Sequence, residues 1–248
     1  MKIAIITQAR VESTRLPSKV LKILVESTLL EIHLGNAKRT KLATDFIVAT
    51  TYEANAYLIE EKSISQGWSC YKGSTNDVLA RFYFATESIM PDYVVRITSD
   101  CPFVQPEVID ELINFAINNN LDYASTSENF PNGVDVEIFT WEMLELAFKT
   151  AKLLSEREHV TPWIRNNATK KGHLEPETDE FKDVRLTVDE IEDFNCIKML
   201  IERFDGDKNW IEYAKFIIEN PELFKNQGIE RNEGYSKSLL NDKELNIG

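Results

Sequence analysis

The stretch Met1-Lys2-Ile3-Ala4-Ile5-Ile6-Thr7-Gln8-Ala9-Arg10 decides the fold of this chain. Its short apolar run at residues 3–6 is rich in β-branched side chains, which is typical of a strand buried on both faces in a parallel sheet. Similar runs recur at residues 46–49 and 93–97, and segments with helical spacing of apolar residues lie between them. This alternation predicts an α/β fold with a mostly parallel sheet.

Working outward from the first strand, the spacing of apolar residues and the capping signals predict the other elements. Asn76 and Pro106 are the residues expected to begin two of the helices. Residues 134–139 alternate like a strand with one wet face, and an irregular tail is expected after Asn220-Pro221. The predicted helices cover residues 29–39, 54–66, 76–89, 106 onward, 155–166, 189–204 and 210–219.

The composition limits the kind of protein. The chain has 248 residues, of which 43% are hydrophobic, so it can bury a sizeable core. Its net charge of −13 argues against a general binder of nucleic acid or anionic membranes, because phosphate contacts need surplus lysine and arginine. Three well-separated cysteines (Cys70, Cys101 and Cys196) indicate reduced thiols rather than a disulfide framework. No apolar run suits a membrane span or a signal peptide, so we expect a soluble, cytoplasmic protein.

The first 41 residues depart from this acidic background. They carry eight lysines and arginines but only three glutamates, which gives the segment a net charge of +5. A basic segment in an acidic chain suggests a local site for an anion.

The polar loop after the first strand is the candidate anion site, because ligands of open α/β sheets bind beyond the carboxyl ends of the strands. It supplies Arg10, Arg15 and Lys19, together with Ser13 and the stiffening Pro17. The chain contains no GxGxxG, GxxxxGK[ST], GxSxG or HExxH motif. Guanidinium and ammonium groups can clamp a triphosphate where glycine backbone amides do not. The alternative is that the loop is only a solvated, charged surface segment.

This loop and several later segments resemble, in order and spacing, the CMP-sugar synthetase-like cytidylyltransferases, and above all their SpsF-like branch. The resemblance implies a three-layer, Rossmann-like nucleotide-diphospho-sugar transferase fold, with a mostly parallel mixed sheet and helices on both faces. It also implies a single nucleotidyltransferase domain over residues 1–225, an acceptor and dimerisation subregion at about 123–180, and a C-terminal tail over 226–248. The matching segments are residues 8–21 (QARVESTRLPSKVL), 72–83, 96–103, 133–137, 156–161, 185–189 and 231–235.

The resemblance implies transfer of CMP from CTP to a sugar or sugar acid, with release of pyrophosphate and with Mg²⁺ as cofactor. Asp100 follows a buried strand, Asp189 follows a second apolar run, and two such carboxylates suit a hard Mg²⁺ ion. By resemblance these two residues are the metal ligands, and Lys19, Arg10 and Asp100 are the catalytic residues. Asp189 as a helix N-cap and Asp100 as a turn residue are the alternatives.

By resemblance the nucleotide lies along the first loop and the third strand. Arg10 and Lys19 would hold the triphosphate, and Lys19 would offset charge at the α-phosphate. CMP-Kdo synthetases carry Gln-Gly-Asp where this chain has Thr98-Ser99-Asp100, so the base contacts of that glutamine do not transfer. For Asn76 and Asp77, the alternative is that they act only as helix caps. The full nucleotide-binding set is Ala9, Arg10, Ser13, Arg15, Lys19, Ser74, Thr75, Arg81 and Ser99.

The acceptor side is expected in the second half of the chain. Asp135 and Glu137 are two apart and would share one face of a strand, and Glu156 and His159 are three apart on one helix face. By resemblance these four residues and Arg185 contact the acceptor. A structural role for His159 is the alternative.

Three functions are weighed. The first is a Mg²⁺-dependent cytidylyltransferase that makes an activated sugar for a surface glycan. The second is a nucleotidyltransferase that uses another NTP or a phosphorylated small-molecule acceptor. The third is a non-catalytic nucleotide- or sugar-binding relative, against which Lys19, Asp100 and Asp189 argue because all three are present. The expected partners are CTP, a small-molecule acceptor and a second copy of the chain in a homodimer.

Overall fold

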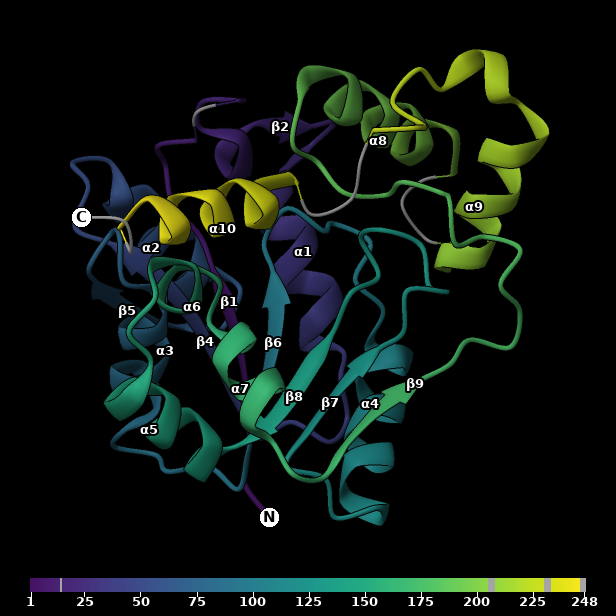
Figure 1. Cartoon of the computed structure of the whole chain (residues 1–248). Coiled ribbons are helices and arrows are strands. Elements are labelled where there is room, and N and C mark those ends of the chain that lie inside the picture. Colours follow the sequence, from purple (N-terminus) through teal and green to yellow (C-terminus); the bar gives the residue numbers. More distant parts are fainter. Residues whose placement is uncertain (14, 205–207, 230–232, 246–248) are drawn as a thin grey trace.

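A seven-stranded mixed sheet forms the centre of the protein (Figure 1). The computed structural model describes residues 1–13, 15–204, 208–229 and 233–245. The strands lie in the order β5-β4-β1-β6-β8-β7-β9, and β8 runs antiparallel to both of its neighbours. The strand bounds are β1 Ile3–Gln8, β4 Asp45–Thr51, β5 Ser69–Gly73, β6 Tyr93–Thr98, β7 Tyr123–Thr126, β8 Glu137–Thr140 and β9 Lys171–Leu174. The predicted mostly parallel sheet is confirmed.

The central strands are buried on both faces, as their continuous apolar runs predict. Ile5 and Val95 belong to one hydrophobic cluster, whereas their neighbours Ile6 and Val94 belong to the cluster on the opposite face. Helices α1 (Leu29–Lys38), α2 (Ala56–Ser65) and α4 (Pro106–Asn118) supply side chains to the first cluster. Helices α3 (Val78–Thr86), α5 (Trp141–Thr150) and α7 (Thr161–Asn167) supply the second. The fold therefore has three layers with helices on both faces, as expected.

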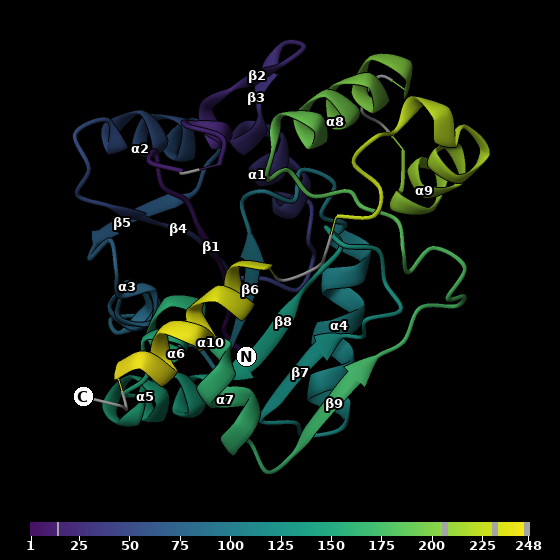
Figure 2. The ribbon, with the colours of Figure 1, turned by 45° about the horizontal axis from the view of Figure 1, so that its top comes forward.

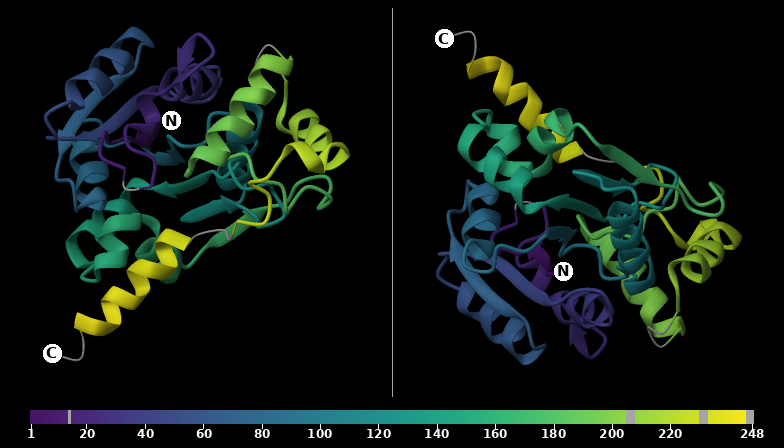
Figure 3. Two further views of the ribbon diagram at one scale, coloured as in Figure 1. Left: turned by 90° about the horizontal axis from the view of Figure 1, so that it is seen from above. Right: turned by 90° about the horizontal axis from the view of Figure 1, so that it is seen from below.

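The C-terminal third of the chain packs at two places around this core. Helices α8 (Ile191–Phe204) and α9 (Trp210–Glu219) extend the first cluster through side chains such as Ile197 and Tyr213. Helix α10 (Glu233–Leu245) lies on the other side, beside α6 (Leu154–His159), as Figures 2 and 3 show. The remaining elements are the 3₁₀ turns η1 (Lys19–Leu21) and η2 (Pro221–Leu223) and a small ribbon of β2 (Ile23–Leu24) and β3 (Ser27–Thr28).

Three element predictions were wrong in detail. The helix expected over residues 155–166 is two helices, because Val160 has a φ of 70° and Pro162 follows it. Asp77, not Asn76, caps α3 by accepting a hydrogen bond from the Ala80 N–H, and α3 ends at Thr86. The tail expected to be irregular contains α10.

Candidate functional site

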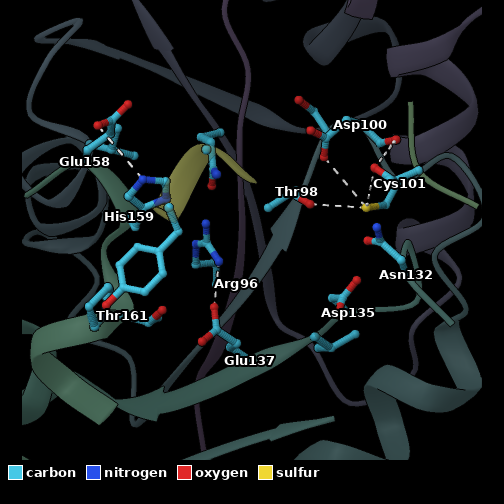
Figure 4. A pocket seen from close by; sticks show the side chains of 18 of the residues that line it. Arg96, Thr98, Asp100, Cys101, Asn132, Asp135, Glu137, Glu158, His159 and Thr161 are labelled. Carbon is cyan, nitrogen blue, oxygen red and sulfur yellow. Dashed lines mark hydrogen bonds and ion pairs between the residues drawn. The ribbon is translucent and has the colours of Figure 1, made fainter. Parts of the chain in front are cut away.

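One large cavity opens at the carboxyl ends of β1, β6, β7 and β9 and the start of β8, where an open α/β sheet binds its ligands. Its volume is about 1110 Å³, which is enough for a nucleotide and a second small molecule together. Figure 4 shows Asp100 at one end and His159 at the other, with Arg96 and Glu137 between them. Residues of the first loop, including Arg10 and Lys19, also line it.

Lys19 joins the two predicted metal ligands. Its Nζ lies 2.9 Å from Asp100 Oδ2, 3.0 Å from Asp189 Oδ1 and 2.8 Å from the Val188 carbonyl oxygen, and it donates a hydrogen bond to each. Arg15 Nη2 adds an ion pair to Asp189 Oδ1 at 2.8 Å. Two carboxylates that are 89 positions apart in the sequence therefore converge on one point. The alternative that Asp189 serves only as a helix cap is wrong, because its carboxylate faces the cavity and binds three cationic side chains.

The charges in this cluster stabilise one another. Burial alone would lower the pKa of Lys19, but Asp100 and Asp189 raise it above its ordinary value. Burial alone would raise the pKa of Asp100, but the charge and hydrogen bond of Lys19 hold it well below its usual range. Both side chains consequently stay ionised at neutral pH.

Hydrogen bonds from neighbouring segments fix where Asp189 lies. The Val188 N–H donates to the Asp100 carbonyl oxygen at 2.8 Å, which ties the two carboxylate-bearing segments together. The buried Asp193 accepts hydrogen bonds from the Asp189 and Glu190 N–H groups at 2.8 and 3.1 Å. Arg185 pairs with Asp193 and also reaches Asp189 at 3.2 Å. Arg185 was predicted to contact the acceptor; it lines the cavity, but its side chain is only 4% exposed and pairs with these two aspartates.

His33 supports the other carboxylate-bearing segment. Its Nδ1 lies 2.8 Å from the Cys101 carbonyl oxygen and its Nε2 lies 3.0 Å from Thr7 Oγ1, so the ring joins β1 to the turn after β6. Burial lowers the pKa of His33 to about 4, so the ring is neutral at pH 7. The sequence offered no signal for this role, because a single buried histidine has no motif.

Glu53, which no sequence pattern singled out, holds the backbone of the first loop through hydrogen bonds. Glu53 Oε2 accepts hydrogen bonds from the N–H groups of Val11 and Glu12, at 3.0 and 3.2 Å. This contact fixes the backbone between Arg10 and Ser13, and both of those side chains line the cavity. The predicted nucleotide residues Ala9, Arg15, Thr75 and Ser99 line it as well.

Two other predicted nucleotide residues have structural contacts. Arg81 lines the cavity, but it is almost fully buried and its Nη1 donates to the Ala49 carbonyl oxygen at 3.1 Å. Burial, with Arg10 nearby, lowers the pKa of Arg81 to about 10. Ser74 lies outside the cavity lining, and its Oγ accepts from the Asp77 N–H at the start of α3.

A row of polar side chains runs across four neighbouring strands and lines the cavity. Arg96, Glu137, Ser125 and His173 are register partners on β6, β8, β7 and β9. Arg96 Nη1 lies 2.6 Å from Glu137 Oε2, and Ser125 Oγ lies 3.0 Å from His173 Nδ1. Only Glu137 of this row was among the predicted site residues, because the others become neighbours only through strand register.

Of the remaining predicted acceptor residues, two line the cavity and one does not. Asp135 and His159 line the cavity, although Asp135 precedes β8 rather than lying on it. Glu156 lies outside it, because its carboxylate accepts hydrogen bonds from the Lys152 and Leu153 N–H groups at the start of α6. Glu158 takes the place on the cavity wall that was expected for Glu156.

Asp100 and Asp189 are the residues of this site that could hold a metal ion. In the described part of the chain, no three His, Cys, Asp or Glu side chains cluster in a way that holds a metal. Asp100 and Asp189 nevertheless converge within 3.0 Å of one atom, Lys19 Nζ. Mg²⁺ is commonly bound by one or two carboxylates together with substrate phosphates, and these two carboxylates can supply that part.

Comparison with known proteins identifies the family to which the chain is similar. Residues 4–229 match the family described as Cytidylyltransferase. A protein of Methanocaldococcus jannaschii described as uncharacterized is 41% identical over 227 residues, 90% of this chain and 93% of its own. The spore coat polysaccharide biosynthesis protein SpsF of Bacillus subtilis is 34% identical over 209 residues, 81% of this chain and 87% of its own.

A solved structure gives the same result. The structure of a cytidylyltransferase from Leptospira borgpetersenii superposes with a TM-score of 0.85 at 32% identity, and the match covers 93% of this chain and 100% of that one. These matches confirm the SpsF-like resemblance and the fold. None of the helices in the described residues has both the length and the apolarity needed to cross a bilayer. The chain belongs to the cytidylyltransferase family.

Proposed function

As the chain belongs to the cytidylyltransferase family, we propose that it transfers CMP from CTP to a hydroxyl group of a sugar or sugar acid, releases pyrophosphate, and serves surface glycan biosynthesis. The observation that carries this proposal is the cluster of Lys19, Asp100 and Asp189 at one end of a cavity whose other end is lined by polar side chains. The name of the Bacillus subtilis relative, which concerns polysaccharide biosynthesis, supports the assignment to glycans.

The triphosphate would lie against the basic loop. Arg10, Ser13, Arg15 and Lys19 all line the cavity and can donate hydrogen bonds to phosphate oxygens. Arg15 and Lys19 already face Asp189, so a bound triphosphate would compete with that carboxylate for the same cations. A Mg²⁺ ion held by Asp100 and Asp189 would supply charge that offsets the phosphates.

The transfer itself needs position and charge more than covalent chemistry. The acceptor oxygen forms a bond to the α-phosphorus, the bond to the β-phosphate oxygen breaks, and the hydroxyl proton leaves to solvent. Lys19, which stays protonated in this cluster, would neutralise charge that develops on the transferred phosphoryl group. The acceptor would be oriented by Asp135, Arg96 and the polar row beyond it.

Pyrophosphate release tests this proposal. Wild-type protein with CTP, Mg²⁺ and a panel of sugars and sugar acids should release pyrophosphate only when an acceptor is present. Asp100→Asn should lower kcat at least about 100-fold, because it removes a charge that the transition state and the metal both need. Asp183→Asn, at an exposed position outside the cavity, is the matched control and should keep wild-type turnover.

Two outcomes would change the assignment. Release with another NTP or only with a phosphorylated acceptor would move the protein to a different nucleotidyltransferase reaction. If no combination of nucleotide and acceptor releases pyrophosphate, the protein is a non-catalytic member of the family that binds only a nucleotide or a sugar.

A further inference from the structure

Helix α10 docks on the acceptor end of the cavity through polar side chains. Helices in globular proteins usually gain their stability by burying an apolar face. In α10 the buried side chains include Ser238 and Asp242, whereas Leu239 and Leu240 are 39% and 59% exposed. Specific hydrogen bonds, rather than apolar burial, therefore set where this helix lies.

Three of these contacts reach α6, which carries part of the cavity wall. Asp242 Oδ1 accepts from the buried Ser155 N–H at 3.1 Å. Ser238 Oγ donates to Glu158 Oε2 at 2.7 Å and lies 3.0 Å from His159 Nε2. Burial lowers the pKa of His159, against the opposing charge of Glu158, so the ring is neutral near pH 7 and can donate from Nε2 to the serine oxygen.

The same helix face supplies part of the cavity lining. Tyr235, Ser238 and Asn241 line the cavity, and their spacing of three residues places them on one side of α10. The Tyr235 ring meets the His159 ring edge to face, with centroids 5.2 Å apart. The Arg165 guanidinium lies 5.8 Å from the Tyr235 ring centre, so the ring is held between two cavity residues.

The chemistry of this face matches one class of ligand. Tyr235 and Asn241 offer an aromatic ring and an amide to the cavity, whereas the Ser238 hydroxyl is already bonded to α6, and none of the three carries a formal charge at neutral pH. A phosphate would be better matched by cations. A sugar ring, which has apolar C–H groups on its faces and hydroxyl groups around its rim, is matched by an aromatic ring with polar neighbours.

We propose that α10 forms a wall of the acceptor subsite and that Tyr235 is a specificity-determining residue that packs against the ring of a sugar or sugar-acid acceptor. This inference rests on the proposed function, which assigns the nucleotide to the opposite end of the cavity. It adds that the C-terminal tail, and not only the nucleotidyltransferase core, selects the acceptor.

The test compares three full-length variants with wild type, with 3-deoxy-manno-octulosonate and N-acetylneuraminate as the probe acceptors. Tyr235→Ala should raise the acceptor KM, or the sugar Kd of the CTP-loaded protein measured by calorimetry, about tenfold, and should leave the CTP Kd unchanged within about twofold. Tyr235→Phe keeps the aromatic ring and should have the wild-type KM or Kd for the sugar. Leu240→Ala, on the exposed side of the same helix, is the control and should behave as wild type.

The two proposals fail in different ways. If no pyrophosphate is released but sugar binding still depends on the Tyr235 ring, the proposed CMP transfer is contradicted and the proposed role of α10 in sugar binding is supported. If wild type and Tyr235→Ala have the same KM or Kd for the sugar, or if neither binds it detectably, the proposed role of α10 as a wall of the acceptor subsite is contradicted. A parallel loss of CTP affinity in Tyr235→Ala would also contradict it, because the ring would then act on the whole cavity and not on the acceptor.

Discussion

Lys19 gives the site its particular electrostatic character. One ammonium group, 14% exposed, holds two carboxylates and a backbone carbonyl oxygen together before any ligand binds. Without it, Asp100 and Asp189 would repel each other and also repel an incoming triphosphate. The lysine would therefore make the acidic pair compatible with the proposed triphosphate substrate.

His33 makes the stability of the protein depend on pH. Its pKa is about 4 in the folded protein, because of burial, and about 6.5 in the unfolded chain, so the folded state binds fewer protons between these values. Stability should therefore fall as the pH decreases from 6.5 toward 4, and His33 alone should account for about 2 kcal/mol between pH 7 and pH 5. Urea unfolding at the two pH values measures this loss.

The matched variants are His33→Gln and His173→Gln. His33→Gln should show a smaller loss of stability between pH 7 and pH 5 than wild type, whatever its stability at pH 7. His173→Gln, which changes an exposed ring, should show the wild-type loss. An unchanged pH dependence in His33→Gln would contradict the buried, neutral ring.

Among the elements, the close pairing of residues 132–134 with residues 185–187 depends on one glycine. Gly133 has a φ of +105°, and a Cβ there would lie 2.6 Å from the backbone carbon of Leu186. Asn132 forms a parallel β-bridge with Arg185, so this pairing also positions the segment that leads to Asp189. Gly133→Ala should therefore lower the free energy of unfolding by at least about 2 kcal/mol.

Gly35→Ala is the control for this prediction, measured by the same denaturant unfolding. Gly35 lies inside α1, and the nearest heavy atom to an added Cβ is 3.8 Å away. The change should leave stability unaltered or raise it by up to about 1 kcal/mol, because alanine is the better helix former. Equal effects of the two substitutions would show that the close approach at Gly133 is not limiting.

The elements also show which parts of the fold can be predicted from local patterns of apolar and capping residues. The strands β1, β4 and β6 and the helices α1, α4, α8 and α9 follow from hydrophobic runs and caps, because each buries a strong apolar pattern. Strands β7 and β9 are short and polar and exist through pairing with neighbours, so the sequence did not indicate them. Helix α10 was missed for the same reason: its docking depends on distant polar partners rather than on an apolar stripe.

The same distinction applies to the site. Arg10, Lys19, Asp100 and Asp189 lie in recognisable motifs and come together as expected. Arg96 and His173 in the polar row, and the supporting residues Glu53 and Asp193, depend on strand register and on contacts between distant segments. No local pattern carries that information, and only the folded chain brings these side chains to the site.

For the whole molecule, the net charge of −13 describes a surface that disfavours extended polyanions, while the basic loop makes one place where a compact anion can bind. The cavity joins that loop to the polar row and to α10, so one opening can hold both reactants. The single domain, the homodimer and the cytoplasmic location remain predictions from the sequence.

Thermal unfolding with nucleotides tests the central claim, that this cavity is a CTP site, most directly. A ligand that binds only the folded state at 100 times its Kd adds about 2.7 kcal/mol of stability, which in a chain of this size raises Tm by about 5–10 °C. With Mg²⁺ present, CTP should raise Tm by that amount and by more than ATP or GTP at the same concentration. Equal shifts with all three nucleotides, or no shift with any of them, would contradict the account.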